Sequence, residues 1–191
     1  MTTNTDKTRI MVECALLIAV GTILAQISFI KLPAGGSVTA ASMVPFIMVS
    51  FRHGTKWGVI SGVANTVLQI ALGGIHMPPA GTFTAVVGSV ILDYVIAYVC
   101  LGFAASFAKP FMKKNKLFAI AFGTVMVCFI RFICSFVSGF LIWSSLMTDG
   151  FGAVVYSLTY NGSYLLPETV ITVVAICVLY KAAPKLFTEV K

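Results

Sequence analysis

The sequence predicts an all-α integral membrane protein with six transmembrane helices and both termini in the cytoplasm. Of its 191 residues, 59% are hydrophobic and 10% are charged, whereas soluble domains carry about 45–50% and about 25%. A soluble chain of this composition would leave large apolar patches in water, which monomeric soluble proteins avoid. The mean hydropathy is +0.99, so lipid is the expected solvent for most of the chain. This composition excludes a soluble enzyme, a disordered tail and a disulfide scaffold.

Six apolar runs separated by short polar gaps are the expected membrane spans of a single domain, residues 1–191. In order they cover about 11–30, 38–51, 57–72, 83–107, 117–147 and 153–180. The first run is long enough to cross a hydrocarbon core of about 30 Å at a rise of about 1.5 Å per residue. The second is too short to cross comfortably alone, so we expect it to be tilted or packed against its neighbour away from lipid. Proline and glycine break the chain at 31–37 and at 73–81.

The positions of the basic residues orient these spans. With the N-terminus inside, six spans place nearly all of the lysines and arginines on the cytoplasmic side, and only Lys31 falls outside. The residues collected inside are Lys7, Arg9, Arg52, Lys56, Lys109, Lys113, Lys114, Lys116, Lys181, Lys185 and Lys191. We therefore assign the net charge of +7 to membrane topology and predict no nucleic-acid partner, because no basic stripe with interleaved aromatic residues is present.

The cysteines and histidines indicate neither a metal nor a cofactor. All five cysteines lie inside apolar runs, without a CxxC motif or a Cys/His cluster, and are expected to be small buried apolar residues. The two histidines, His53 and His76, fall in loops on opposite sides of the membrane, and neither HExxH nor a paired-carboxylate motif is present. An intramembrane enzyme is therefore the weaker hypothesis. An autonomous small carrier is also disfavoured, since no inverted repeat is visible.

Four ionisable residues lie within the apolar runs, where each costs at least about 2.5–3.5 kcal/mol to insert. Glu13 is near the cytoplasmic end of the first run, where local hydrogen bonding explains it. Asp93 lies about 15 Å below the outer surface and Arg131 about 21 Å above the inner one, so an ion pair between them is one explanation. Glu168, deeper and just after Pro167, is an alternative partner for Arg131.

A second explanation of Asp93 is a ligand site in the outer half of the membrane. Tyr156, Tyr160 and Tyr164 recur every four residues and share one helix face, with Asn161 beside it. Trp143 lies near the outer end of the fifth run, and Ser135 is two turns deeper on roughly the same side. A carboxylate with aromatic rings and an amide suits a flat, cationic, hydrogen-bonding molecule. An interfacial aromatic belt would explain Trp143 and Tyr156 alone, but it explains neither Asp93 nor Asn161.

The first run also carries a small-xxx-small spacing, Ala15 to Ala19. Small residues four apart let another helix approach closely in lipid. This face is expected to dock either a partner protein or another helix of the same chain.

Five stretches of the chain carry a family resemblance. They are LPAGGSVT at 32–39, MVP at 43–45 with FRHG at 51–54, LDYVIAY at 92–98, RFICSFVSG at 131–139 and YSLTYNGSY at 156–164. Together they resemble the substrate-binding S components of energy-coupling factor (ECF) vitamin transporters, specifically the thiamine-binding ThiT type. The stretches cover nearly the whole chain in order, and the first and last are the most specific.

The resemblance implies the ECF S-component fold, with high-affinity binding of thiamine from the outside beneath a lid formed largely by the loop between spans one and two. It implies partners as well: a transmembrane coupling subunit, which Ala15 and Ala19 would contact, and two cytoplasmic ATPases. Delivery of the vitamin would follow toppling of the S component in the membrane. This chain has no GxxxxGK[ST] phosphate loop of its own, as expected if ATP is hydrolysed elsewhere.

Carried over by position, the resemblance places Asp93 opposite the cationic ligand, with Trp143 and Tyr156 as aromatic contacts and Asn161 as a polar contact. The expected substrate site is completed by Ser135, Tyr94, Gly36, Tyr160 and Tyr164. Two residues depart from the family pattern, because relatives commonly have histidine at the position of Ser135 and some have an aromatic residue at Gly36. These departures leave open a thiamine precursor, an analogue or another vitamin of pyridine or pyrimidine type as the ligand.

Overall fold

The computed structural model describes residues 4–33, 35–144 and 149–187 and contains six helical bodies, as the sequence predicts. The first three are α1 (Asn4–Gln26), α2 (Val44–His53) and α3 (Thr55–Gly73). The fourth runs from α4 (Phe83–Ser89) through α5 (Ala97–Val99) to α6 (Ala104–Ala108) and ends in a short 3₁₀ turn at Phe111. The last two are α7 (Lys116–Ser138), extended to Trp143, and α8 (Gly150–Ala182). Residues 145–147 of the fifth predicted run and Lys191 lie outside the described residues.

Four of these bodies are long and apolar enough to cross a membrane: Thr5–Gln26, Phe83–Phe111, Lys116–Trp143 and Gly150–Ala182. Their outward faces carry exposed apolar side chains. On α8 the exposed residues include Leu166, Val170, Val174 and Val178, whereas the buried positions, among them Asn161, Leu165 and Glu168, recur every three or four residues. One side of the helix is therefore suited to lipid and the other to the protein interior.

The predicted second span, 38–51, is wrong as a continuous helix. Its first residues form strand β2 (Ser37–Thr39), and α2 begins only at Val44 and is 10 residues long, far too short to cross a bilayer. Every side chain from Val44 to Phe51 is buried. The sequence-based expectation that this run packs away from lipid is thus confirmed, and α2 is the central core helix of the cytoplasmic half.

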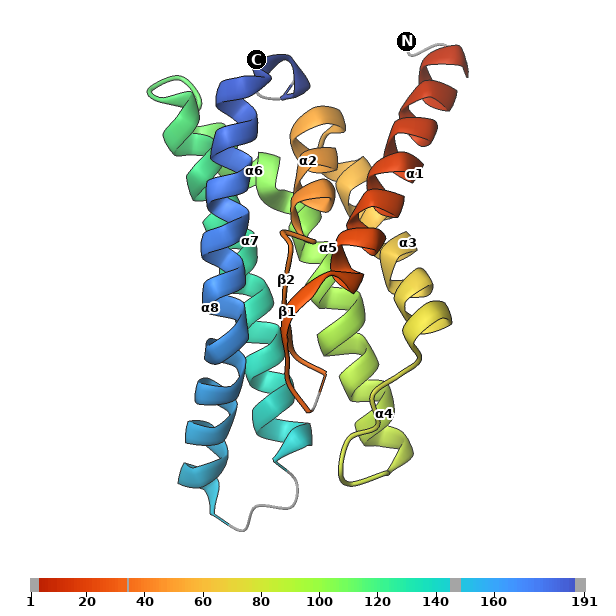
Figure 1. Cartoon of the computed structure of the whole chain (residues 1–191), viewed down its shortest axis with the longest axis vertical. Coiled ribbons are helices and arrows are strands. Elements are labelled where there is room, and N and C mark those ends of the chain that lie inside the picture. Colours follow the sequence, from red (N-terminus) through yellow and green to blue (C-terminus); the bar gives the residue numbers. More distant parts are fainter. Residues whose placement is uncertain (1–3, 34, 145–148, 188–191) are drawn as a thin grey trace.

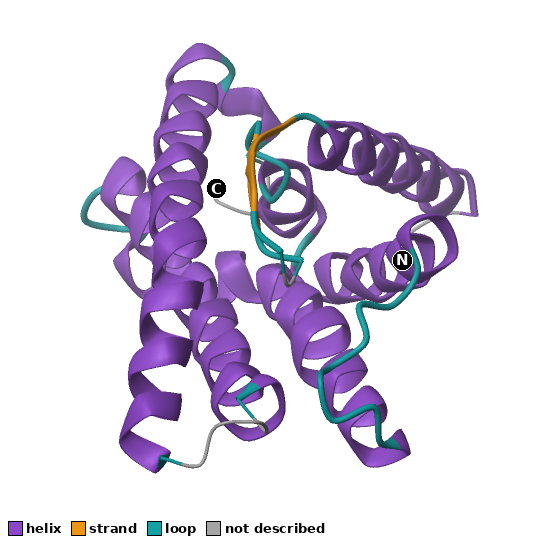
Figure 2. Ribbon diagram, turned by 60° about the horizontal axis from the view of Figure 1, so that its bottom comes forward, coloured by secondary structure: helices purple, strands orange, loops and turns teal. Residues whose placement is uncertain are grey.

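The first predicted span, 11–30, also ends too late. Helix α1 stops at Gln26, and strand β1 (Ser28–Lys31) follows it and pairs antiparallel with β2. We call β1, the turn and β2 the lid hairpin. Figure 2 shows its strands lying among the helices rather than beyond them, and β2 packs against both α8 and α1. The pairing satisfies backbone groups that would otherwise be unpaired at membrane depth, where such groups are tolerated only inside the protein.

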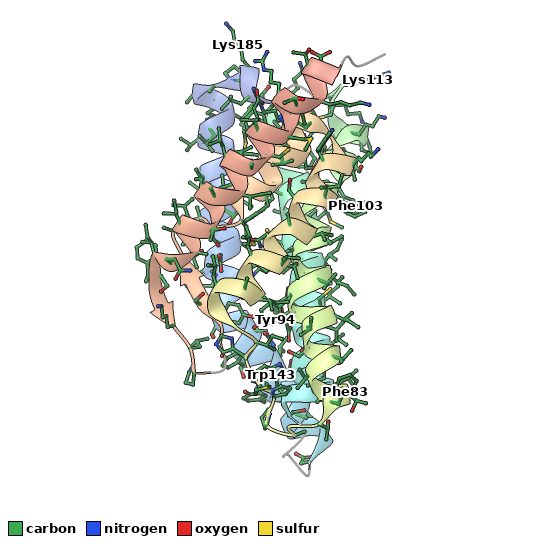
Figure 3. All side chains as sticks on the ribbon, turned by 90° about the vertical axis from the view of Figure 1, so that its right-hand side faces the viewer. Phe83, Tyr94, Phe103, Lys113, Trp143 and Lys185 are labelled. Carbon is green, nitrogen blue, oxygen red and sulfur yellow. The ribbon has the colours of Figure 1, made fainter. Side chains whose placement is uncertain are left out.

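Both ends of the described chain lie at the same end of the bundle (Figure 1), as an even number of spans requires. Lys113 and Lys185 project from that end, whereas Tyr94 and Trp143 lie toward the other (Figure 3). Glu13 is the centre of an ion cluster in the same half. Its carboxylate accepts from Arg9 at 3.2 Å, Arg52 at 2.6 Å and His53 at 2.9 Å, which ties α1 to the end of α2. Local hydrogen bonding therefore accounts for this carboxylate, as the sequence indicated.

Two π-helical segments interrupt the long helices at the end opposite the basic residues. One, Val90–Ile96, contains Asp93, and the other, Gly139–Trp143, ends at Trp143. Both pack against α7 or α8 in the outer half of the bundle. A π-helical segment widens the helix and shifts the direction in which side chains project, and such segments are frequent at functional sites. Here they turn Asp93 and Trp143 toward one another.

Candidate functional site: a buried cavity beneath the lid hairpin

A cavity of about 140 Å³ lies between the lid hairpin, the fourth helical body, α7 and α8. All nine residues predicted from the sequence as a substrate site line it: Gly36, Asp93, Tyr94, Ser135, Trp143, Tyr156, Tyr160, Asn161 and Tyr164. The structure therefore brings together side chains from four separate parts of the chain.

Asp93 is held in the cavity wall by three donors. Its Oδ2 accepts from Ser138 Oγ at 2.5 Å, Ser89 Oγ at 3.0 Å and the indole Nε1 of Trp143 at 3.2 Å. Within the described chain no residue donates to Oδ1. The three bonds fix the carboxylate and stabilise its charged form, and they leave one oxygen for a group in the cavity.

The ion pair considered for Asp93 and Arg131 does not form. The salt bridges among the described residues all involve Glu13, so the prediction that Arg131 pairs with Asp93 or with Glu168 is wrong in both forms. Instead, Arg131 Nη2 donates to Tyr98 Oη at 3.3 Å, and its Cζ lies 4.4 Å from the centroid of the Tyr98 ring. A guanidinium stacks favourably on an aromatic face, and this contact with Tyr98 is found in place of the predicted ion pairs.

Glu168, only 2% exposed, instead binds the base of the lid hairpin. Its Oε1 accepts from Thr39 Oγ1 at 2.6 Å and from Ser42 Oγ at 3.1 Å. A buried charge needs such donors to be tolerated. The contact joins α8 to the point where the lid hairpin returns to α2, and it places a second carboxylate at the cavity.

The tyrosines of α8 form an aromatic wall, as their four-residue spacing predicts. The rings of Tyr156 and Tyr160 stack with centroids 5.7 Å apart and 25° between their planes, and Tyr160 meets Tyr164 edge to face at 6.0 Å. Asn161 is hydrogen-bonded to this wall and to α7. Its Nδ2 donates to the carbonyls of Ser135 and Ser157, and its Oδ1 accepts from the Tyr164 hydroxyl at 3.1 Å. The amide thus positions Tyr164 and ties α8 to α7.

Gly36 and Ser135, the two residues that depart from the family pattern, both lie at the cavity. A Cβ on Gly36 would lie 2.7 Å from the ring carbons of Tyr164, so Tyr164 already fills the space beside this glycine. The backbone N–H of Gly36 donates to Tyr160 Oη at 3.3 Å. Ser135 lines the cavity, is 7% exposed, and its carbonyl accepts from Asn161 Nδ2. The ring of Tyr164 thus occupies the space beside Gly36.

His76 is a cavity residue that the sequence did not single out. Its backbone N–H donates to Tyr94 Oη at 3.2 Å, and its Nδ1 lies 3.2 Å from the same oxygen. The imidazole also packs against Gly35, where an added Cβ would come within 3.0 Å of its ring. The segment between α3 and α4 therefore touches the lid hairpin directly. Tyr98, Arg131 and Glu168 also line the cavity, although the site predicted from the sequence did not include them.

The predicted docking face on α1 is open. Ala15 and Ala19 are both exposed on the described structure, whereas Cys14 and Ile18 next to them are buried against the core. Within the described residues, the two alanines therefore do not serve as a contact between helices of this chain. No group of three His, Cys, Asp or Glu residues in the same part of the chain is arranged to hold a metal ion.

These features define a class: a helical membrane protein with a polar, aromatic-lined cavity beneath a hairpin, suited to a small organic molecule. Comparison with known proteins identifies the family. Residues 11–188 match the thiamine transporter protein family (Thia_YuaJ), and the chain belongs to it. It is accordingly a multi-pass cell-membrane protein of thiamine uptake and not an enzyme.

Individual relatives agree with this assignment. The chain is 30% identical over 190 residues to the thiamine transporter ThiT of Bacillus subtilis, covering 95% of both chains. It is 29% identical over 156 residues to ThiT of Lacticaseibacillus paracasei, covering 76% of this chain and 74% of that one. A solved structure of ThiT from Listeria monocytogenes superimposes with a TM-score of 0.74 at 23% identity, over 95% of this chain and 98% of the other. The superposition confirms the six-helix fold.

Proposed function

We propose that the cavity beneath the lid hairpin is the thiamine site and that Asp93 faces the positively charged thiazolium ring. The hydrogen bonding of the Asp93 carboxylate is the observation that supports this proposal. This carboxylate is fixed by three donors on Oδ2, and among the described residues nothing donates to Oδ1 and no cation forms a salt bridge with it. A buried carboxylate without a counter-ion is costly, and a cationic ligand removes that cost.

The charges around the cavity support a ligand with a single positive charge. Two carboxylates, Asp93 and Glu168, and one guanidinium, Arg131, line it. The formal charges of these three groups sum to one net negative charge. Thiamine carries one permanent positive charge on its thiazolium ring, so binding would neutralise the site without requiring a proton or an inorganic ion.

The aromatic residues supply the remaining affinity. Trp143 is anchored by its bond to Asp93, and Tyr156 is anchored by stacking on Tyr160, so neither ring has to be ordered when the ligand binds. Rings of this kind attract a cation through their faces and stack on flat heterocycles. Preorganised rings improve affinity because less side-chain entropy is lost on binding.

In this proposal the protein is the S component of an ECF importer. It would bind thiamine from the outside and deliver it to the cytoplasm together with a transmembrane coupling subunit and two ATPase subunits. The exposed pair Ala15 and Ala19 on α1 supports a helix-docking face, since small residues allow close approach in lipid. Replacing both alanines with leucine should abolish copurification with the coupling subunit and leave thiamine binding intact. Copurification at the wild-type level would refute this docking face.

Titration of the purified protein with thiamine tests the binding proposal. The chain has two tryptophans, Trp143 at the cavity and Trp57 at the start of α3, so they form a matched pair of probes. We expect thiamine to quench the fluorescence of the wild type and of Trp57→Phe, and to have little effect on that of Trp143→Phe. Equal quenching in the two variants would place the ligand elsewhere, and calorimetry without a binding signal would refute the proposal.

A further inference from the structure

The turn between the fourth helical body and α7 gathers positive charge at one point of the cytoplasmic end. Four lysines fall within the short stretch 109–116, and all four are exposed: Lys109, Lys113, Lys114 and Lys116. The turn projects from the end of the bundle at which both ends of the described chain lie (Figure 1). Membrane topology requires basic residues on this side, but it does not require them to cluster in one turn. The cluster therefore needs a further explanation.

The charge of these four lysines is not offset by a salt bridge within the described chain. The salt bridges found there all involve Glu13 and its partners on α1 and α2. Like charges this close repel one another, and the partial positive charge at the start of α7 adds to the repulsion. A negatively charged group at the turn would relieve it.

Three phenylalanine rings lie beside the lysines and join the two helices. Phe111 packs against Phe118 and Phe122 of α7, with ring centroids 5.6 and 4.7 Å apart. Phe118 is 53% exposed. The helical bodies Phe83–Phe111 and Lys116–Trp143 are both long and apolar enough to cross a membrane, so this ring lies where they leave the lipid. The turn thus places exposed ammonium groups next to an exposed apolar ring.

We propose that this lysine–phenylalanine turn, residues 109–118, binds an anionic phospholipid of the cytoplasmic leaflet. The ammonium groups attract the headgroup phosphate, and the acyl chains cover Phe118. Clusters of four or more basic residues directly cytoplasmic of a transmembrane helix are typical of sites for anionic lipids. The turn lies at the opposite end of the bundle from Trp143 (Figure 3), so the proposal is independent of the thiamine site.

Two other occupants match the turn less well. A zwitterionic phospholipid has the same acyl chains, but its own cationic group offsets the phosphate charge. An acidic segment of a partner protein would match the lysines but would leave the ring of Phe118 uncovered. An anionic phospholipid matches both the charge and the apolar surface.

A tryptophan introduced at Phe118 reports which lipid lies against the turn. In a Trp57→Phe/Trp143→Phe background, Phe118→Trp is the single emitter of the full-length protein in phosphatidylcholine vesicles. The probes are phosphatidylglycerol and phosphatidylcholine brominated on their acyl chains, which quench a tryptophan that they contact. We expect the apparent association constant to be at least about fivefold higher for phosphatidylglycerol, which is the effect of a single lysine near an anionic surface. Phe83→Trp in the same background, at the opposite end of the bundle, should show no such preference.

Two variants that remove equal charge test the role of the lysines. Lys113→Gln/Lys114→Gln should bring the ratio of the two association constants toward one. Lys181→Gln/Lys185→Gln, which alters the end of α8, should preserve the ratio, because Lys185 and Lys113 lie toward opposite sides of the bundle (Figure 3). Without any substitution of lysine, about 1 M salt should also reduce the ratio, since it shortens the screening length to about 3 Å.

Equal quenching of Phe118→Trp by the two lipids would overturn the proposal, as would the same preference at Phe83→Trp. A preference that survives Lys113→Gln/Lys114→Gln would also overturn it, and loss of copurifying cytoplasmic subunits in that variant would then assign the turn to a protein partner. With the native tryptophans present, Lys113→Gln/Lys114→Gln should bind thiamine as the wild type does. The outcome of this experiment is therefore separate from that of the thiamine titration.

Discussion

Replacing Asp93 with asparagine removes one charge from the cavity and little else. The amide keeps an oxygen for the three donors now on Oδ2, and its volume is nearly that of the acid. For a thiazolium charge about 5 Å from the carboxylate and an effective dielectric constant of about 20, the lost attraction is about 3 kcal/mol. We therefore expect thiamine to bind on the order of 100-fold more weakly to Asp93→Asn.

The assay compares thiamine with a neutral isostere in which a thiophene ring replaces the thiazolium ring. Calorimetry of both ligands on both proteins gives a double-mutant cycle in which only the charge–charge contribution remains. Binding of the neutral isostere should change by less than about tenfold, because its shape and hydrogen bonds are unaffected. That binding also shows that the variant is folded. An equal loss of affinity for the two ligands would refute the charge pairing, and Asp149→Asn should leave both affinities unchanged.

Three further predictions concern the lid and the cytoplasmic end. Gly36→Ala places a methyl group 2.7 Å from the Tyr164 ring, so the lid should seat poorly and thiamine should dissociate faster in stopped-flow measurements. Gly73→Ala, whose Cβ would meet nothing within 4 Å, should behave as the wild type. His76→Ala removes the contact between the lid hairpin and the segment before α4. We expect thiamine to dissociate faster from this variant, with little change in its thermal unfolding midpoint. An unchanged dissociation rate would show that this contact does not hold the lid closed. Glu13→Gln should lower the free energy of unfolding by about 1–2 kcal/mol through loss of its charged hydrogen bonds and leave the thiamine Kd unchanged, and a weakened Kd would contradict a purely structural role.

The parts of the site that repeat along one helix could be predicted from the sequence. Tyr156, Tyr160 and Tyr164 are four residues apart, which fixes their common face on any α-helix. Asp93 could be predicted as a site residue because a carboxylate in an apolar run is costly in lipid and requires a reason. Both inferences depend only on local geometry and on the cost of charge in lipid, and all four residues line the cavity.

The partner of Arg131 could not be predicted in the same way. Rise per residue gives the depth of a side chain in the membrane, but not the direction in which it points around the helix. Asp93 and Arg131 lie at similar expected depths, yet Arg131 faces Tyr98, one turn further along the fourth helical body than Tyr94. The π-helical segment around Asp93 changes the angle by which successive side chains rotate about the helix axis, so the spacing of a regular α-helix does not predict where Asp93 points.

The strands of the lid hairpin and the place of His76 at the cavity could not be predicted for a different reason. Strand β1 has four residues and β2 three, and both continue apolar runs that the sequence assigns to helices. So short a pair is stabilised by the surrounding helices rather than by its own composition. His76 lies in a proline- and glycine-rich loop without periodicity, so only the tertiary contacts with Tyr94 and Gly35 reveal its place at the cavity.

The most direct test of this account is an experimentally determined structure of the protein with thiamine bound. We predict that the thiazolium ring lies within about 5 Å of Asp93 Oδ1, between Trp143 and the tyrosines of α8, with the lid hairpin closed over it. Density for thiamine outside the cavity, or an Asp93 carboxylate paired with Arg131 and turned away from the ligand, would contradict it.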